Sequence, residues 1–334
     1  MITNLQVRNF RGLKDVTLRE LRRVNLLVGG NDTGKTSVLE ALVLLLGEGG
    51  SINQLPVAFR NNQSGGHSGN NSDDKENFWA WLFYDRDAIN TIAITAKIDS
   101  NEQLAVSTQS TAHGPMLLRT DKSGGKQLVV FEPGNVRVVG QKSPEGFRVS
   151  RLSVRPSHPV EDAEKYNQIA LEREGEARFE TIMREVEPRL NRLRYAKLPG
   201  TSSPLVFVDL GLSRAVPSTQ MGQAFNRILH IYAEILTSKT NVLLVDEIEN
   251  GIFSESLPLI WKGLLAICEQ QNVQIFATTH SRECVMAAHA AAEERGKDEL
   301  SVQRLQIVKG DVEAVRLGKQ HLEVAAEMGL EVRS

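Results

Sequence analysis

The sequence predicts an α/β protein whose mixed sheet is joined to an antiparallel β subdomain and to a helical lobe. Three observations support this fold class. The run Val24–Val28 is mostly apolar and precedes a glycine-rich turn, as expected of a strand buried on both faces. A strand, a helix and a strand follow one another over residues 242–277, which implies parallel pairing. Short alternating runs between residues 91 and 139 indicate an antiparallel meander.

The N-terminal part is expected to contain strands at residues 4–7 and 24–28, with a further apolar segment at 16–18. Apolar residues at helical spacing predict a helix over Lys35–Leu46, and the glycines that follow would end it. Residues 51–76 are polar and rich in glycine and asparagine, which predicts a mobile surface loop. The runs of the meander are 91–98, 103–108, 116–120, 127–131 and 136–139.

The second half begins with a charged, helix-periodic stretch at residues 163–194. A strand at 204–209, a helix at 222–237 and a strand–helix–strand unit at 242–245, 255–269 and 273–277 follow. The tail after His280 predicts a helix, a strand pair at 305–308 and 313–316, and a final helix. We expect one domain over 1–334, with a core of residues 1–50 and 204–334, an antiparallel insertion at 51–160 and a helical lobe at 161–203.

The bulk composition excludes several classes of protein. A formal net charge of −2 over 334 residues does not fit a protein that coats nucleic acid, although a local basic face is compatible with it. Two cysteines without metal-ligand spacing indicate a reduced protein. The N-terminus lacks a secretory pattern, and no apolar run approaches the roughly 20 residues that span a bilayer. We therefore expect a cytoplasmic protein with no membrane association.

The first motif follows the buried strand and fits the Walker A pattern G-x-x-x-x-G-K-[ST] at each fixed position. Its backbone N–H groups can donate hydrogen bonds to phosphate oxygens, and the helix N-terminus adds partial positive charge. Lys35 is expected to reach the β- and γ-phosphates, and the Thr36 hydroxyl to coordinate Mg²⁺. The alternative is a chance glycine-rich turn. The predicted ATP-binding residues here are Gly29, Gly30, Asn31, Asp32, Thr33, Gly34, Lys35, Thr36 and Ser37.

The second motif is an apolar strand, Val242–Val245, that ends in two acids. The carboxyl end of a buried strand presents such acids to a crevice. We expect Asp246 to hold the metal ion and Glu247 to be the catalytic base that activates water, a role worth ~10²–10⁴ in rate. An apolar strand that ends in Asp-Glu also arises by chance, so the motif depends on its position before the 273–277 strand.

The third motif, residues 278–281, reads Thr-Thr-His-Ser at the end of the next predicted strand. His280 would reach the same sheet edge as Asp246 and act as a catalytic sensor of the γ-phosphate. The alternative is a surface histidine at a helix start, where Thr279 or Ser281 could cap the helix.

These motifs in this order resemble the ABC-type ATPases of the SMC and recombination-repair group, and more narrowly the OLD-like AAA family (overcoming lysogenisation defect). Further similar segments are Asn-Phe-Arg-Gly at 9–12, Asp-Glu-Ile-Glu-Asn-Gly at 246–251 and the C-terminal residues 329–333. The resemblance implies a P-loop NTPase with the ABC-ATPase-type mixed sheet. It also implies ATP and Mg²⁺ as ligands and an ATP-dependent homodimer.

The resemblance implies further site residues. In the family, a signature segment of one subunit closes over the ATP of the other, and residues 217–225 are a degenerate version in which Ser218 and Gly222 would contact the γ-phosphate. A capped helix start is the alternative. Arg11 would lie near the nucleotide, or else be an exposed turn arginine without a role. Phe253 stands where relatives often carry histidine, and Gln54 and Gln63 are candidates for the glutamine loop.

Three functional hypotheses remain besides the leading one, a dimeric ATPase that drives a nucleic-acid-processing or anti-phage defence partner. A nucleotide-gated interaction module with negligible hydrolysis fits the degenerate signature. The soluble half of a membrane transporter is a further hypothesis, but it would require an intact signature motif, and residues 217–225 are a degenerate one. A nuclease is disfavoured, because only 54 residues follow His280 and they contain no clustered acids. Kinship implies instead a separate nuclease or effector protein, with nucleic acid as a further partner.

Overall fold

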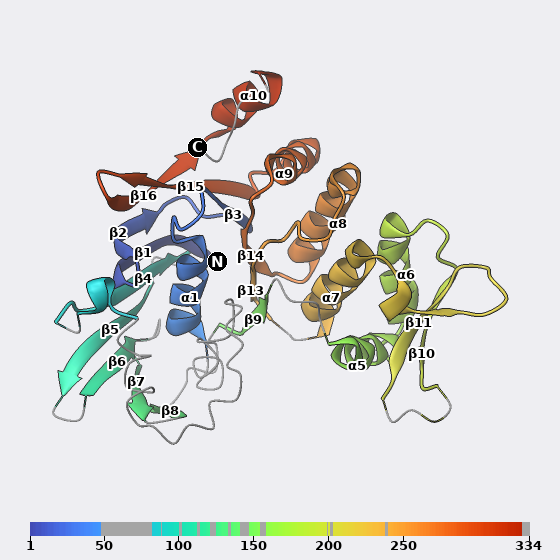
Figure 1. Ribbon diagram of the computed structural model, residues 1–334, viewed down its shortest axis with the longest axis horizontal. Helices are drawn as coiled ribbons and strands as arrows, with labels where there is room; N and C mark the ends of the chain where they lie inside the picture. The colour runs from blue at the N-terminus through green and yellow to red at the C-terminus, as the bar shows by residue number, and fades with distance from the viewer. Residues whose placement is uncertain are drawn as a thin grey trace.

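The computed structural model describes residues 1–47, 82–87, 89–99, 102–111, 114–120, 125–132, 135–140, 147–153, 158–198, 200, 203–237 and 240–328. Within these residues the strands form three sheets, whose orders are β2-β1-β4-β5-β6-β7-β8, β10-β11-β12 and β16-β15-β3-β14-β13-β9. Figure 1 shows the antiparallel sheet on one side, the core with helices α7–α9 in the middle, and the lobe of α5, α6, β10 and β11 on the other. The expected α/β architecture with two attached parts is confirmed.

The six-stranded sheet is the core of the fold. Its strands are β3 (Val24–Val28), β9 (Val149–Leu152), β13 (Val242–Val245), β14 (Gln274–Thr278), β15 (Leu300–Val308) and β16 (Asp311–Leu317). All neighbouring pairs are parallel except β15 and β16, which form an antiparallel hairpin. The carboxyl ends of β3, β13 and β14 therefore meet at one edge, where parallel sheets bind ligands.

One strand of this sheet comes from an unexpected place. The four residues of β9 pair in parallel with β13, from Val149 opposite Val242 to Leu152 opposite Val245. They belong to the 51–160 stretch in which the sequence predicts an antiparallel insertion. The chain thus returns to the core sheet before it enters the helical lobe.

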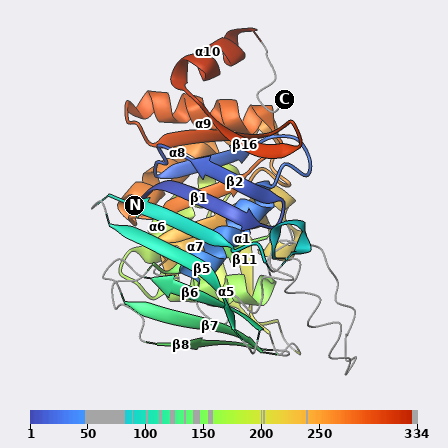
Figure 2. The same ribbon diagram turned by 90° about the vertical axis from the view of Figure 1, so that its left-hand side faces the viewer.

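The seven-stranded sheet is antiparallel throughout the described residues, and Figure 2 shows it face on. Its strands are β1 (Ile2–Phe10), β2 (Leu13–Leu18), β4 (Ala93–Ile98), β5 (Gln103–Thr111), β6 (Gly114–Thr120), β7 (Lys126–Glu132) and β8 (Asn135–Val139). The meander expected after residue 91 is confirmed, with strands longer than their apolar runs. The predicted loop at 51–76 lies outside the described residues.

Helix α1 (Lys35–Leu46) lies between the two large sheets and is buried on nearly every side. Alternate side chains of the core strands point to opposite faces, as pleating requires. Leu27, Leu244 and Phe276 pack toward α1 together with the inner face of the antiparallel sheet. Leu26, Leu243 and Ile275 pack on the opposite face. There they meet the helices α7 (Gln223–Thr237), α8 (Leu257–Gln270) and α9 (Arg282–Arg295).

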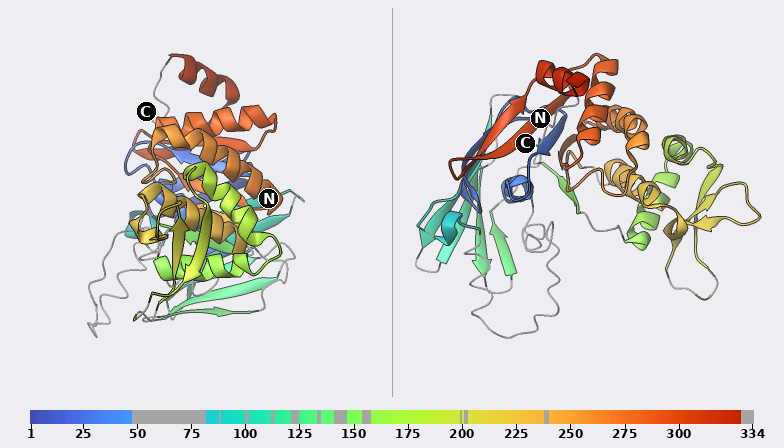
Figure 3. Two further views of the ribbon diagram at one scale, coloured as in Figure 1. Left: turned by 90° about the vertical axis from the view of Figure 1, so that its right-hand side faces the viewer. Right: turned by 45° about the horizontal axis from the view of Figure 1, so that its top comes forward.

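The helical lobe corrects one sequence prediction. The helix-periodic stretch at 163–194 forms α5 (Pro159–Ala170) and α6 (Gly175–Val186), and its end is instead the strand β10 (Arg192–Ala196). Pro188 cannot continue the helix, and Leu193 alternates with exposed arginines in the two-residue period of a strand. Strands β11 (Leu205–Asp209) and β12 (Val216–Pro217) complete this small sheet. Figure 3 shows the lobe projecting from the core. Helix α10 (Lys319–Met328) is the last described element.

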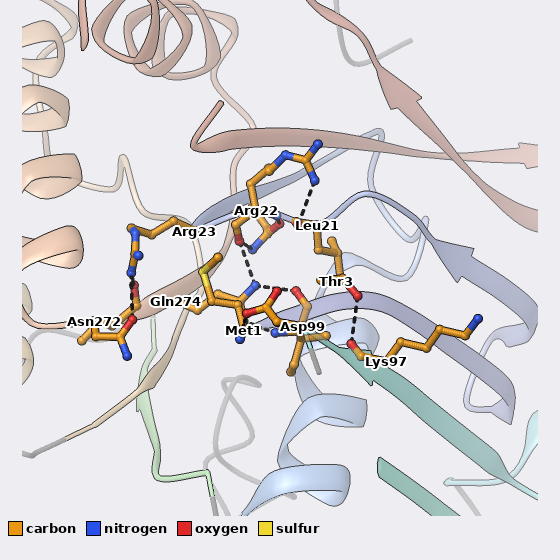
Figure 4. A network of polar contacts seen from close by, with 12 residues as sticks. Met1, Thr3, Leu21, Arg22, Arg23, Lys97, Asp99, Asn272 and Gln274 are labelled. Carbon is orange, nitrogen blue, oxygen red and sulfur yellow. Dashed lines mark hydrogen bonds and ion pairs between the residues drawn. The ribbon is translucent and has the colours of Figure 1, made fainter. Parts of the chain in front are cut away.

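A buried glutamine joins the two large sheets (Figure 4). The Gln274 side chain accepts a hydrogen bond from Ile2 N at 2.9 Å and donates to Ile2 O at 2.8 Å. It also donates to Arg22 O at 2.8 Å, just before β3. The start of β1 is thereby fixed to the start of β14. Because Gln274 is buried, these partners offset the cost of removing its amide from water.

Candidate nucleotide-binding site

The loop between β3 and α1 has a backbone that only glycine fits at two positions. Gly29 has φ +142°, and a Cβ there would lie 2.2 Å from Leu305 O. Gly34, the residue before α1, has φ +87°, and a Cβ there would lie 2.5 Å from a Leu13 methyl. No side chain caps the N-terminus of α1. Its first N–H groups are thus available to an anion, as phosphate binding requires.

Lys35 is held over this loop. Its side-chain ammonium donates to Gly29 O at 2.9 Å and to Gly30 O at 2.6 Å. Burial lowers the pKa of Lys35, while the carboxylates of Asp246, Asp32 and their neighbours act in the opposite direction. The buried ammonium therefore donates to neutral backbone carbonyls. Negatively charged phosphate oxygens would be stronger hydrogen-bond acceptors for it.

The second and third motifs converge on the first. Asp246 Oδ1 lies 3.5 Å from Thr36 Oγ1 and accepts a hydrogen bond from Thr278 Oγ1 at 2.6 Å. Thr278 Oγ1 in turn accepts from Glu247 N at 2.8 Å. Burial raises the pKa of Asp246, and the hydroxyls of Thr278 and Thr36 oppose that shift. Thr278 thus fixes both acids, a role that the sequence did not indicate.

The backbone around Glu247 is strained. Glu247 has φ +46°, in the left-handed region that residues other than glycine rarely adopt. Such strain costs on the order of 1–3 kcal/mol, persists only where neighbours hold it, and is frequent at active sites. The next loop is tied to the same turn, because His280 N donates to Glu249 Oε1 at 2.6 Å.

The cleft over the Walker A loop has a volume of about 900 Å³, within the usual range for small-molecule sites. Its lining includes Arg11, Gly12, Asn31, Asp32, Gly34, Lys35, Thr36, Ser37, Phe83, Asp85, Arg86, His280 and Val312. His280 therefore lies at the cleft. The capping part of the alternative is also confirmed, because Ser281 Oγ accepts from Cys284 N at 3.0 Å and caps α9.

Arg11 lies at the cleft but is not an exposed turn arginine. Its guanidinium forms an ion pair with Glu40, at 2.5 Å between Nε and Oε2. The two side chains are 9% and 0% exposed. Glu40 belongs to α1, so Arg11 connects the turn after β1 to the helix that follows the Walker A loop. A contact between Arg11 and the nucleotide stays a prediction.

Arg227 on α7 is a site residue that the sequence did not reveal. One Nη donates to Asp246 O at 2.7 Å and Glu247 O at 3.2 Å, and the other donates to Ser153 O at 2.6 Å. The residue is 8% exposed, and burial lowers its pKa. Only its three-dimensional contacts identify it, because an arginine on an amphipathic helix has no distinctive pattern. It holds the backbone of both acids.

The candidate signature segment lies at the start of α7, apart from the residues that line the cleft. Ser218 is 3% exposed, whereas Thr219, Gln220 and Gly222 are exposed. The segment touches the turn after Glu247, since a Cβ on Gly251 would lie 2.8 Å from Gln223 Cβ. Contacts of Ser218 and Gly222 with a second subunit's nucleotide stay predictions.

The Phe253 side chain is 80% exposed on the same turn as Gly251. Gln54, Gln63 and the C-terminal segment 329–333 lie outside the described residues.

A magnesium ion fits the pair Thr36 and Asp246. Within the described part of the chain, no group of three or more His, Cys, Asp or Glu side chains has metal-binding geometry. Mg²⁺ is usually bound by one or two protein groups together with substrate phosphates and water, so one hydroxyl and one carboxylate at the phosphate end suit it.

Cys268 and Cys284 are buried thiols, and burial raises the pKa of each to about 12.

The Walker A cradle, the acids at the end of β13 and the mixed sheet define a P-loop NTPase with the ABC-ATPase-type fold. Residues 1–197 match the family model described as "AAA ATPase domain", which covers more than half of the chain. The chain belongs to this family of ATPases. Residues 117–285 also match "AAA domain, putative AbiEii toxin, Type IV TA system".

Individual relatives agree with this assignment. The chain is 20% identical over 333 residues to the "ATP/GTP phosphatase" of Helicobacter pylori, covering 85% of this chain and 86% of that protein. A stretch of 44 residues is 54% identical to the "DNA replication and repair protein RecF" of Nitrosococcus oceani, covering 13% of this chain and 12% of that protein.

Solved structures show the same fold. An SMC head bound to the C-winged helix domain of ScpA has a TM-score of 0.56 at 12% identity, covering 96% of this chain and 98% of that one. The Pyrococcus furiosus SMC head with an extended coiled coil, bound to the C-terminal domain of ScpA, has a TM-score of 0.54 at 11% identity, covering 98% and 99%. None of the described helices is long and apolar enough to cross a bilayer. The narrower resemblance to the OLD-like group stays a prediction.

Proposed function

We propose that the protein hydrolyses ATP with Mg²⁺ and that two copies associate around the nucleotide. The observation that carries this proposal is the convergence of Thr36, Asp246 and Thr278 at the end of the Walker A loop. Asp246 Oδ1 lies 3.5 Å from Thr36 Oγ1 and 2.6 Å from Thr278 Oγ1. Lys35 and the α1 N-terminus bind the phosphates. Thr36 and Asp246 hold Mg²⁺, which neutralises phosphate charge when bound.

Glu247 is the proposed base. Its backbone is positioned by Thr278 and Arg227, and the carboxylate orients and deprotonates a water molecule for attack on the γ-phosphate. His280 lines the cleft and hydrogen-bonds the γ-phosphate, and Glu249 fixes its backbone. The Gly222 N–H of a second copy completes the γ-phosphate environment. Its exposed position at the start of α7 supports this role.

Substitution Glu247→Gln tests this assignment. We expect ATP affinity within about threefold of the parental protein, turnover reduced by ~10²–10⁴ and an ATP-dependent dimer that accumulates. Steady-state phosphate release, nucleotide titration and light scattering measure the three quantities. Glu255→Gln is the matched control, because this exposed glutamate lies on the next turn and should leave all three unchanged. Parental turnover in Glu247→Gln would show that the base is wrong.

One observation favours a second function, a nucleotide-gated interaction module with negligible hydrolysis. Ser218 is 3% exposed, so its hydroxyl is not on the surface that a second copy would meet. Steady-state phosphate release by the parental protein separates the two functions. A turnover number above about 0.01 s⁻¹, modest beside typical enzymes, excludes the module.

By kinship with its family, the dimer is proposed to switch a nucleic-acid-processing or anti-phage defence partner, such as a separate nuclease. The SMC heads of similar fold are themselves bound to a partner protein, ScpA. Co-purification of a nuclease with Glu247→Gln and ATP, lost without ATP, is the expected result. Equal recovery with and without ATP would contradict nucleotide control of the partner.

A further inference from the structure

We propose that Arg86 stacks on the base of the bound nucleotide and that this end of the cleft accepts adenine and guanine almost equally. This inference rests on the proposed function, because it takes the phosphates to lie at Lys35. It concerns the opposite end of the cleft, which the motifs at residues 29–36, 242–247 and 278–281 do not include.

The arrangement of the cleft fixes which end receives the base. His280 follows β14 and the two acids follow β13, and both of these strands lie on one side of β3 in the core sheet. The turn η1 (Tyr84–Arg86), in cyan at the left of Figure 1, and the β15–β16 hairpin lie on the other side. Phe83, Asp85, Arg86 and Val312 line the cleft there. With the phosphates at the Walker A loop and the γ-phosphate toward His280, the nucleoside extends toward this turn.

The turn is held in place on several sides. Phe83 forms a β-bridge with Phe10, and Leu82 O accepts from Arg11 N at 2.8 Å. Tyr84 O accepts from Asn90 Nδ2 at 3.0 Å, and the Tyr84 hydroxyl donates to Asp311 Oδ1 at 3.4 Å. These bonds tie the turn to β1 and to the β16 end of the hairpin.

Asp85 and Arg86 are both kept in the left-handed region. Each has φ +55°, a conformation that residues other than glycine adopt only when their surroundings impose it. Strained residues of this kind cluster at active sites and ligand clamps. Their presence at the cleft, beside a fixed turn, is what a clamp on the nucleoside requires.

The side chains at this end suit a flat aromatic ring. Phe83 and Val312 are 4% and 8% exposed and form an apolar floor, while Arg86 is exposed at the cleft. A guanidinium plane stacks on the π face of any nucleobase, whereas a lysine ammonium lacks the plane. Arg86 and the apolar floor together can thus enclose a purine from its faces.

The same side chains do not distinguish the hydrogen-bonding edge of adenine from that of guanine. Among the described residues that line the cleft outside the Walker A region (31–37) and His280, those with polar side chains are Arg11, Asp85 and Arg86. Arg11 is paired with Glu40, and Asp85 is exposed, so water competes for its carboxylate. Strong discrimination, about 10⁴–10⁵, needs buried groups that are left unpaired by the wrong ligand. We therefore expect ATP and GTP affinities to differ by less than about tenfold.

The test compares three ligands in the presence of Mg²⁺: ATP, GTP and inorganic tripolyphosphate, which has no nucleoside. We expect Arg86→Ala to weaken ATP and GTP binding by about tenfold, the effect of losing one stacking partner, and to leave tripolyphosphate unchanged. Arg86→Lys should recover only part of the affinity. Arg173→Ala removes an exposed arginine between α5 and α6, far along the lobe, and should change nothing.

Several results would overturn the inference. They are an equal loss of tripolyphosphate binding in Arg86→Ala, unchanged ATP and GTP binding in that variant, or a preference above about 100-fold for one purine in the parental protein. Failure of the proposed function looks different. In that case the parental protein binds neither tripolyphosphate nor ATP, or Lys35→Ala leaves tripolyphosphate binding intact.

Discussion

The Walker A side and the signature side of this molecule are built in contrasting ways. Around α1 the predicted binding groups are buried or half-buried and have partners in the same chain: Lys35 on the loop carbonyls, Arg11 on Glu40, and Thr36 beside Asp246. The start of α7 is exposed, with Gln223 close to Gly251 on the turn after the acids, and Arg227 further along α7 donates to the backbone of both acids. From this contrast we expect nucleotide binding to be a property of the single chain and turnover to depend on α7 as well.

The largest effect on stability is expected at the buried pair of the binding side. Arg11→Ala breaks the ion pair of the buried Glu40 carboxylate, and breaking a buried pair in this way typically costs about 3–5 kcal/mol of unfolding free energy. Arg8→Ala is the matched control, because Arg8 lies on β1, just before the Arg11 turn, and its ion pair with Asp15 at 3.1 Å is about half-exposed and worth at most about 1 kcal/mol. Urea unfolding measures both. Equal losses would mean that the Arg11 pair carries no special role.

Turnover should separate from binding at Arg227. Arg227→Met removes three hydrogen bonds to main-chain carbonyls, two of them at Asp246 and Glu247. Hydrogen bonds to charged groups are worth roughly 1.5–3 kcal/mol each, so a fall of about 10²-fold in kcat is expected. ATP affinity should stay within about threefold, and Arg227→Lys should lose less. A Kd that rises in proportion to the fall in kcat would contradict the division between the two sides.

A smaller effect is expected where α7 meets the acid-bearing turn. Gly251→Ala places a Cβ 2.8 Å from Gln223 Cβ at φ +77°. Gly296→Ala shares the strained φ, +65°, but has nothing within 4 Å of the new Cβ. We expect each variant to lose about 1 kcal/mol from backbone strain, Gly251→Ala to lose more because its Cβ also displaces Gln223, and only Gly251→Ala to lower turnover. Identical turnover in the two variants would show that this contact does not serve hydrolysis.

The same contrast explains what the sequence could predict. The Walker A loop, α1 and the acids after β13 follow from local rules, because glycine spacing and a buried strand determine them within a few residues. Arg227, Thr278 and Glu40 act through partners 19 to 74 positions away in the chain, and their residue types carry no pattern. The four-residue strand β9 is too short for periodicity to reveal its parallel pairing.

In the helical lobe the sequence prediction is wrong at one boundary. The apolar stripe of α6 ends at Val186, whereas the predicted helical stretch runs past Pro188 into β10. Alternation of Leu193 with Arg192 and Arg194 was the available signal. For the nucleoside end, the turn at Asp85 and Arg86 has no motif at all, since its strain is visible only in the backbone.

The proposed function depends on the binding of phosphates by Lys35 at the N-terminus of α1. The most direct measurement is calorimetric titration of ATP and Mg²⁺ into the parental protein and into Lys35→Ala, with folding checked by circular dichroism. Loss of a buried, hydrogen-bonded charge should weaken binding by about 10²-fold or more. An unchanged ATP affinity in a folded Lys35→Ala protein would contradict the account.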